Sequence, residues 1–325
     1  MKMMKEFNYK QFFINNSACV ILILLVVIAT AIMGTTFLNV SNLRNILLNN
    51  AIIGIIALGM TLVIISGGID LSVGAATAGC GLVALWVMNL TSNILLGMLA
   101  AIALGVVMGA FNGTLVARFN IPAFIVTLGA MRIFRSLSLH FFQGGGILVD
   151  SEVQSFLAFS NTRLFGGVLP LPVIYWLALA VLVSFVVKRT ALGRHIYAVG
   201  SNERAANLSA INVRRVKTYV YMISGALVAV AAIVEASRLG SMNSASSGIF
   251  YELEAIAAVV IGGTAMSGGR GRIIGTVFGT LTLGVINNLM NLMGLPSFLV
   301  GAIQGSIVVL AVLLQRSVGQ KAKQF

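Results

Sequence analysis

The sequence predicts an all-α fold: a polytopic transmembrane helical bundle of about ten spans, with the N- and C-termini on the cytoplasmic side. Three observations lead to this prediction. Of the 325 residues, 58% are hydrophobic and only 9% are charged, whereas soluble domains carry about 25% charged residues. The apolar residues form runs long enough to cross a bilayer. Basic residues gather between particular runs, and a surface this poor in charge would not keep a soluble domain solvated.

Ten apolar runs are candidate spans, because a span needs about 20 mostly apolar residues. In chain order the runs are 18–36, 46–66, 72–90, 94–117, 121–138, 169–187, 218–237, 251–267, 273–293 and 297–315. The fifth run contains Arg132 and Arg135, and the eighth opens with Glu252 and Glu254. We expect the first run to be retained as a span, since its end is a poor cleavage site and more spans follow.

A single transmembrane domain is predicted over 1–325. Spans one to six fall in 18–187 and spans seven to ten in 218–315. The segment 188–217 between them is a basic loop. Both cysteines, Cys19 and Cys80, lie in apolar runs, so no disulfide framework is indicated.

The basic residues orient the bundle. With ten spans and a cytoplasmic N-terminus, the inside receives Lys2, Lys5, Lys10, Arg118, Lys188, Arg189, Arg194, Arg204, Arg214, Arg215, Lys217, Arg270, Arg272, Arg316, Lys321 and Lys323. The outside receives Arg44, Arg132, Arg135, Arg163 and Arg238. Cytoplasmic loops of membrane proteins are enriched in Lys and Arg. The distribution therefore agrees with a cytoplasmic N-terminus and places the polar stretch 139–168 outside.

Several chemistries are not indicated. His140 and His195 have no Cys, Asp or Glu at ligand spacing, so no metal site is expected. A Walker A loop needs a Gly-Lys pair, and the chain has none. No nucleophile–base arrangement is recognisable. We therefore expect no enzyme activity and no cofactor on this chain, and any ATP must be hydrolysed elsewhere.

Glycine is the next signal. The chain has 35 glycines, some at helical small-residue spacing such as Gly105 with Gly109 and Gly275 with Gly279. Small residues let helices approach closely in lipid, so we expect a tight bundle. Two glycine-rich breaks, 66–74 and 261–272, each follow an apolar run.

Asp70, in the first break, suits an N-cap of the next helix. The same break is also compatible with a half-helix terminus beside a solute path.

Polar side chains inside the spans are candidates for such a path. The carboxamides Asn112, Asn287, Asn291 and Gln304 fall within apolar runs. Buried carboxamides often join helices, and they equally suit a path for a neutral solute such as a sugar. An ion-coupled path more often uses carboxylates buried in the membrane.

The acidic residues are expected at the edges of the spans. Asp70 falls at a turn, and Glu235 lies three residues before Arg238, so these two are expected to form a local ion pair at the outer rim. Glu252 and Glu254 at a helix start are expected to offset the helix dipole.

The basic loop contains a short predicted helix. Gly200 permits the entry turn, Ser201 can cap the helix, Glu203 suits its first turn, and Asn212 can end it. The three residues at helical spacing on one face are Ala205, Leu208 and Ile211. This helix suits either an anionic lipid surface or a groove in a cytoplasmic partner protein. Its small side chains favour the protein groove.

Five ordered motifs carry a family resemblance. They are 67–74 (GGIDLSVG), 112–138 (NGTLVARFNIPAFIVTLGAMRIFRSLS), 193–213 (GRHIYAVGSNERAANLSAINV), 237–241 (SRLGS) and 251–276 (YELEAIAAVVIGGTAMSGGRGRIIGT). In this order the chain resembles the membrane permeases of ribose-type ABC sugar importers, over nearly its whole length. The family loop of the form G-x-N-x-x-A-A is matched by Gly200, Asn202, Ala205 and Ala206.

The resemblance implies a permease in the bacterial inner membrane that works with several partners. A cytoplasmic ABC ATPase would bind ATP and Mg²⁺ and act on the coupling loop at Gly200, Asn202, Glu203, Ala205, Ala206, Leu208 and Ile211. A periplasmic sugar-binding protein would dock near Glu235, Arg238 and Glu252. A second permease copy or paralogue would complete a dimer in the lipid bilayer, and no nucleic acid is involved. The path candidates are Asn112, Asn287, Asn291, Asp70 and Gln304.

The function expected on this basis is import of a monosaccharide, and a pentose such as ribose is the first candidate. An ion-coupled secondary transporter of a small polar solute is the alternative, because its hydropathy would be the same. A non-transporting membrane anchor for an ATPase is a third interpretation.

Overall fold

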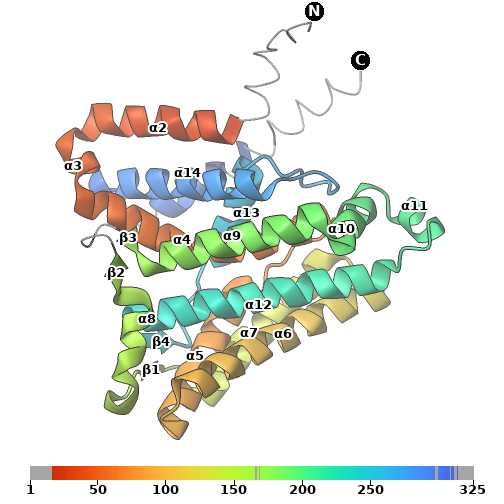
Figure 1. Cartoon of the computed structure of the whole chain (residues 1–325), viewed down its shortest axis with the longest axis horizontal. Coiled ribbons are helices and arrows are strands. Elements are labelled where there is room, and N and C mark those ends of the chain that lie inside the picture. The colour runs from red at the N-terminus through yellow and green to blue at the C-terminus, as the bar shows by residue number, and fades with distance from the viewer. Residues whose placement is uncertain are drawn as a thin grey trace, which may run out of the picture.

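The structure is a computed structural model that describes residues 17–164, 167, 169–296, 299–307, 309, 310 and 313. The two predicted cytoplasmic termini, with six of their basic residues, lie outside the described residues, as does part of the predicted tenth span. Within the described residues the chain is mostly helical (Figure 1).

The helices are α2 (Ser17–Met33), α3 (Thr35–Leu38), α4 (Val40–Ile65), α5 (Val73–Thr91), α6 (Ile94–Arg118), α7 (Ala123–Phe141), η1 (Ser151–Leu157), α8 (Ala158–Asn161), α9 (Leu171–Arg189), α10 (Ala191–Ser201), α11 (Glu203–Leu208), α12 (Val213–Leu239), α13 (Tyr251–Ile261) and α14 (Ile273–Leu292). Four short strands are β1 (Gly146–Leu148), β2 (Arg163–Leu164), β3 (Leu169–Pro170) and β4 (Ser241–Asn243). Strand β1 pairs antiparallel with β4, and β2 with β3.

The structure confirms a polytopic helical membrane fold. In the described part of the chain, seven helices are long and apolar enough to cross a membrane: α4, α5, α6, α7, α9, α12 and α14. Helices satisfy every internal backbone group without water, which is what lipid demands. The 17 residues of α2 form a shorter apolar helix. The seven helices correspond to seven of the ten predicted runs.

The predicted eighth span is wrong as a continuous helix. Instead of 251–267, α13 covers 11 residues and ends at Ile261. A left-handed turn follows, with φ of 86° at Gly263, a conformation that glycine adopts without strain. At about 1.5 Å per residue, α13 is too short to cross about 30 Å of hydrocarbon.

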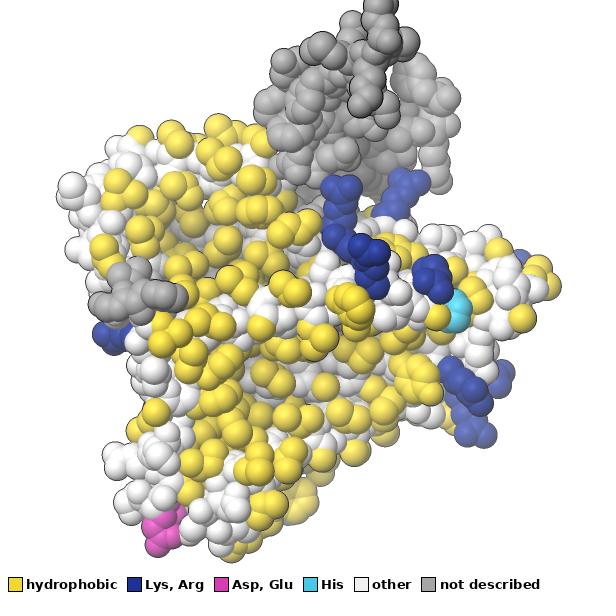
Figure 2. Space-filling view, viewed as in Figure 1, with side chains coloured by type: hydrophobic (Ala, Val, Ile, Leu, Met, Phe, Trp, Pro, Cys, Tyr) yellow, Lys and Arg dark blue, Asp and Glu magenta, His cyan; other side chains and the backbone are white. Residues whose placement is uncertain are grey.

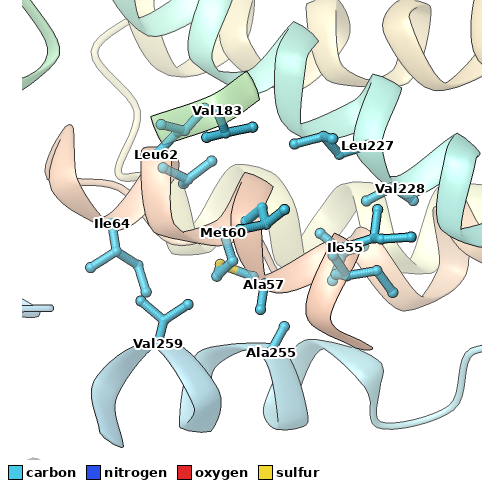
Figure 3. Packing of buried hydrophobic residues seen from close by; sticks show 14 of the residues in the cluster. Ile55, Ala57, Met60, Leu62, Ile64, Val183, Leu227, Val228, Ala255 and Val259 are labelled. Atoms are coloured by element: carbon cyan, nitrogen blue, oxygen red, sulfur yellow. The ribbon is translucent and has the colours of Figure 1, made fainter. Parts of the chain in front are cut away.

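Helix α4 is the centre of the core. Its residues 51–65 are all buried. Figure 3 shows its Ile55, Met60 and Leu62 among side chains from α9 and α12, while α13 packs on the other side through Val259. Because α4 contacts helices on all sides, it is apolar all round, as expected for a buried helix.

Close backbone contacts confirm the tight packing predicted from glycine spacing. A Cβ atom on Gly105 or Gly225 would overlap the carbonyl oxygen of the other residue, where α6 crosses α12. At the α13–α14 crossing, Gly275 packs in the same way on Gly262, and Gly279 on the carbonyl oxygen of Ala258. Any larger side chain would force these helices apart.

The bundle has two distinct ends. One end carries α10, α11 and the turns that follow α4, α6 and α13, and the other carries the strands, η1 and α8 (Figure 1). Dark blue Lys and Arg side chains gather at the α10–α11 end in Figure 2. The exposed acids Asp150 and Glu152 lie at the opposite end. The two ends therefore differ in charge as the loop pattern predicted.

Candidate functional site

Two helix N-termini meet within the bundle. After α12 ends at Leu239, the chain turns back along α5 through β4 and then starts α13 at Tyr251. A Cβ on Gly74, at the start of α5, would overlap the carbonyl oxygen of Gly248, and a Cβ on Gly248 would overlap that of Gly74. Helix N-termini carry unpaired N–H groups and partial positive charge. This meeting point therefore favours carboxylates and other acceptors.

Glu252, in the first turn of α13, supplies one such carboxylate. Its Oε2 would be 2.5 Å from a Cβ placed on Gly74. Its charge interacts with that of Arg135 on α7, and Arg135 donates from Nη1 to the carbonyl oxygen of Ser244 at 2.9 Å. The Glu252 carboxylate thus compensates two positive charges: the partial charge of the α5 N-terminus and the charge of Arg135.

Tyr251 ties α13 to α12. Its hydroxyl donates to Glu235 Oε1 at 2.9 Å. Glu235 is 4% exposed, and Oε2 has no hydrogen-bond partner within the described residues. The expected ion pair with Arg238 does not form within 4.0 Å, because the Tyr251 hydroxyl holds the carboxylate on the buried face of α12. Glu235 therefore lies inside the bundle, not at an outer rim where a protein could dock.

Glu254, two residues after Glu252, lies on the other side of α13 from Glu252. Gln304 donates from Nε2 to Glu254 Oε1 at 3.3 Å and to Asn287 Oδ1 at 2.9 Å. The structure thus brings together two of the carboxamides singled out from the sequence and adds a carboxylate to them. Asn291, one turn further along α14, is exposed.

The neighbouring Asn288 has a structural role. It exchanges two hydrogen bonds with Asn42 of α4, at 3.0 and 2.7 Å. This amide pair joins α4 to α14, which is the helix-joining role that buried carboxamides often have.

Asp70 and Asn112 form a second, separate group. Asp70 Oδ1 accepts from the Ser72 backbone N–H at 2.9 Å and from Ser72 Oγ at 2.6 Å. Asn112 donates from Nδ2 to Ser72 Oγ at 2.8 Å. The prediction that Asp70 is the N-cap of α5 is wrong, because Ser72 takes the cap position. The Asp70 side chain instead accepts from the backbone two residues on, as in an Asx turn. Burial raises the pKa of the Asp70 carboxyl, and hydrogen bonds from Ser72 oppose that shift.

The predicted loop helix is displaced. Ser201 is the last residue of α10, and Asn202 caps α11 by accepting from the Ala205 N–H at 3.0 Å. Asn212 caps the start of α12, not the end of α11. The prediction chose the wrong cap because Ser and Asn are equally good at that position.

Of the three residues on the predicted docking face, Ala205 and Leu208 are exposed. Ala206 is buried, whereas Leu208 is 89% exposed and Ile211 is partly buried. Glu203 lies in the first turn, as predicted, and its Oε2 pairs with Lys217 Nζ at 2.6 Å. This ion pair joins α11 to α12.

Both glycine-rich breaks meet the loop at one backbone junction. Gly269 donates from its N–H to the Ile65 carbonyl oxygen at 2.9 Å. A Cβ on Gly200 would overlap that same oxygen and lie 2.7 Å from Gly269 N. Tyr197 adds a hydrogen bond from its hydroxyl to the Gly271 carbonyl oxygen at 2.8 Å. Movement of α10 would therefore act directly on the C-terminal end of α4 and on the turn after α13.

A cavity of about 240 Å³ opens beside α11. Its lining includes Gly67, Gly68, Glu203, Lys217 and Tyr221.

Sequence reasoning missed several residues of these groups. Tyr251 and Ser72 carry no local signal of their own, Arg135 was noted only as a charge within the fifth apolar run, and Glu254 was interpreted only as dipole compensation. Glu254 and Gln304 are separated by 50 positions, so only the fold brings them together.

Comparison with known proteins finds one matching family. The family described as branched-chain amino acid transport system / permease component matches residues 42–313. No solved structure matches the chain significantly.

Several relatives are permeases of transport systems. The chain is 40% identical over 305 residues to the ribose import permease protein of Escherichia coli, covering 92% of each chain. It is 41% identical over 303 residues to the ribose import permease protein of Bacillus subtilis, covering 90% of each. It is 36% identical over 299 residues to the L-arabinose transport system permease protein of Escherichia coli, covering 91% of this chain and 89% of that protein.

Proposed function

Because the chain belongs to the family of branched-chain amino acid transport system permease components, we propose that it is the permease subunit of a binding-protein-dependent ABC importer for a monosaccharide, with ribose as the first candidate. The observation that carries this proposal is the 40% identity to a ribose import permease over 92% of both chains. The absence of a Gly-Lys pair from the sequence agrees with an ATPase on a separate subunit.

The proposed assembly has four kinds of component. A cytoplasmic ABC ATPase binds ATP and Mg²⁺, and this chain binds neither. A periplasmic protein delivers the sugar, and a second permease copy or a paralogue completes the membrane part. The assembly lies in the bacterial inner membrane with the α10–α11 end in the cytoplasm, since Lys and Arg gather there (Figure 2).

The proposed coupling runs from α11 to the two helix N-termini. Closure of the ATPase moves α11, and α10 passes this movement to the junction of Gly200, Ile65 and Gly269. Ile65 ends α4 and leads through the first glycine-rich break into α5. The turn containing Gly269 follows α13 directly. The movement therefore reaches both helices whose first turns meet at Gly74 and Gly248.

The proposed path follows the polar side chains of the bundle. It includes Asn287 and Gln304 beside α13, and Asn291 one turn along α14. Asp70 and Asn112 lie near the start of α5 and belong to the same proposed path. Each state of the cycle must contact the sugar differently, because only a difference in interaction free energy shifts the equilibrium between states.

Reconstitution in liposomes tests the proposal. The permease, its ATPase and its binding protein are combined, and uptake of radiolabelled ribose and arabinose is measured with ATP inside. We expect uptake to require all three proteins and ATP, and to survive an ionophore that collapses ion gradients. Uptake by the permease alone under a proton or sodium gradient would instead establish an ion-coupled transporter. A complex that hydrolyses ATP but moves no sugar would establish a membrane anchor.

A further inference from the structure

Among the described residues, Glu254, Asn287 and Gln304 leave polar atoms without hydrogen-bond partners. Gln304 Nε2 bridges Glu254 Oε1 and Asn287 Oδ1. Within the described residues, no hydrogen bond reaches Glu254 Oε2, Asn287 Nδ2 or Gln304 Oε1. The three side chains are only partly buried, so these atoms are open to whatever lies beside α13 and α14.

Contact of these atoms with lipid would be unfavourable. An unpaired polar group in hydrocarbon costs several kcal/mol, and ionisable residues inside membranes generally face an aqueous cavity or each other. Asn287 lies within α14, one of the seven helices able to cross a membrane. Glu254 packs beside it on the short helix α13. Gly301 and Gly305, close to Gln304 in the chain, border open space, since a Cβ on either would meet no atom within 4 Å.

The free atoms form a set of mixed polarity. A carboxylate oxygen and an amide oxygen accept hydrogen bonds, and an amide NH₂ group donates them. Each hydroxyl of a sugar can both donate and accept. A carboxylate accepts strong hydrogen bonds from hydroxyls, and the adjacent amide NH₂ can donate to the same or the next hydroxyl. Among the described residues no cationic side chain hydrogen-bonds to this group, and the Glu254 carboxylate would repel an anionic solute.

On this basis we propose that Glu254, Asn287 and Gln304 form a binding subsite for the vicinal hydroxyl groups of the transported neutral sugar. This proposal rests on the proposed function and adds the contact residues to it. Glu254 Oε2 accepts from one hydroxyl, and Asn287 Nδ2 donates to a neighbouring one. Gln304 holds the other two side chains in register through its two hydrogen bonds. The first turn of α13, which meets α5 at Gly248 and Gly74, places this subsite next to the moving part of the bundle.

The test uses the complete transport complex in liposomes, with every sugar at a concentration that saturates the binding protein. Ribose is compared with deoxy analogues that each lack one hydroxyl. We expect Glu254→Gln to reduce ribose flux about tenfold or more, as for loss of a charge-assisted hydrogen bond, while stimulated ATP hydrolysis changes less. For one analogue, lacking the hydroxyl that Glu254 contacts, the variant and the parent protein should transport at similar rates. For Asn287→Leu, the analogue transported at similar rates by variant and parent should be a different one, which lacks the adjacent hydroxyl.

Glu152→Gln is the matched control, since it makes the same chemical change in η1 at the strand end of the bundle, where Glu152 contacts Ser92. It should transport every sugar at the parental rate. If Glu254→Gln lowers the flux of all analogues by one common factor, or changes none, the subsite assignment is wrong. If the variants dissociate a permease dimer, the face binds a second copy instead. Failure of the parent complex to move any monosaccharide would reject the proposed function itself.

Discussion

Gly74 and Gly248 lie backbone to backbone, each at the start of a helix, so that neither position has room for a side chain. Gly74 belongs to α5 and Gly248 precedes α13. The contact joins two segments that the sequence separates by more than half of the chain. It also fixes where Glu252 lies, because the carboxylate abuts Gly74. A change at this contact should therefore affect both helices together.

Gly74→Ala should impair transport more than insertion. The added methyl group would overlap the Gly248 carbonyl oxygen and approach Glu252 Oε2, so α5 and α13 must separate. Overpacking of this kind costs about 1–3 kcal/mol. We expect the variant to insert at near parental levels, to melt at a lower temperature and to lose most of its sugar uptake.

Gly129→Ala is the control for this change. Gly129 lies on α7, and a Cβ there meets no atom within 4 Å. The control should behave as the parent protein. Full uptake by Gly74→Ala would show that the contact between the two helix starts is not needed for transport.

Hydropathy was enough to predict most of the helices. The apolar runs that became α4, α6 and α14 are long and bounded by polar turns, so their length alone identifies them. The run at 251–267 misled the prediction because Ala, Val and Ile at 255–261 are equally apolar in a full span and in a short buried helix. The helix ends early at the left-handed turn that contains Gly263, and apolar composition alone does not reveal that turn.

The polar groups were harder to predict. Sequence reasoning selected Asn287 and Gln304 because amides are rare in apolar runs, and the fold places them in contact. Glu254 was interpreted as a helix-end charge, since its partner is 50 positions away. The cap at α11 was ambiguous for a local reason: Ser201 and Asn202 have similar capping strength, and the packing of α10 decides between them.

Gly200→Ala should uncouple ATP hydrolysis from transport. The methyl group would overlap the Ile65 carbonyl oxygen and crowd Gly269, which opens the junction between α10 and the two glycine-rich breaks. We expect the ATPase to bind still, because α11 lies beyond the junction, but sugar transported per ATP should fall several-fold. The Gly129→Ala variant again serves as control. An unchanged ratio of sugar to ATP would contradict the assigned role of the junction.

Variants at Asp70 separate two effects of a buried carboxylate: the cost of its charge and the benefit of its hydrogen bonds with Ser72. Burial raises its pKa above the ordinary value, so the folded protein binds the proton more tightly than the unfolded chain. The charged form is therefore less favourable in the folded state, and stability falls as pH rises above the unfolded pKa. Asp70→Asn keeps an acceptor for Ser72 and removes this charge, so its melting temperature at pH 7 should equal or exceed that of the parent.

Asp70→Ala should have the opposite effect. It removes both hydrogen bonds to Ser72 and leaves buried donors unpaired, which costs about 1–3 kcal/mol for each unsatisfied group. Thermal unfolding in the same detergent at pH 5 and pH 7 measures both variants. A melting temperature for Asp70→Asn well below that of the parent at pH 7 would show that the charge itself stabilises the turn.

Leu208 is expected to anchor the ATPase. It is 89% exposed on α11, and the neighbouring cations Arg204, Arg214 and Arg215 are also exposed. An apolar pocket with an acidic rim on the partner would complement this surface. Truncating such an anchor typically weakens binding by about 2 kcal/mol or more, which is roughly thirtyfold in affinity. Leu208→Ser should therefore lose ATPase binding and uptake, while its melting temperature stays close to the parental value because the side chain packs on little else.

Leu239→Ser, an equally simple change of a 57% exposed leucine at the other end of the bundle, should keep the ATPase bound. Equal ATPase affinity of the two variants, measured with purified subunits in nanodiscs, would place the docking contact elsewhere on the basic end.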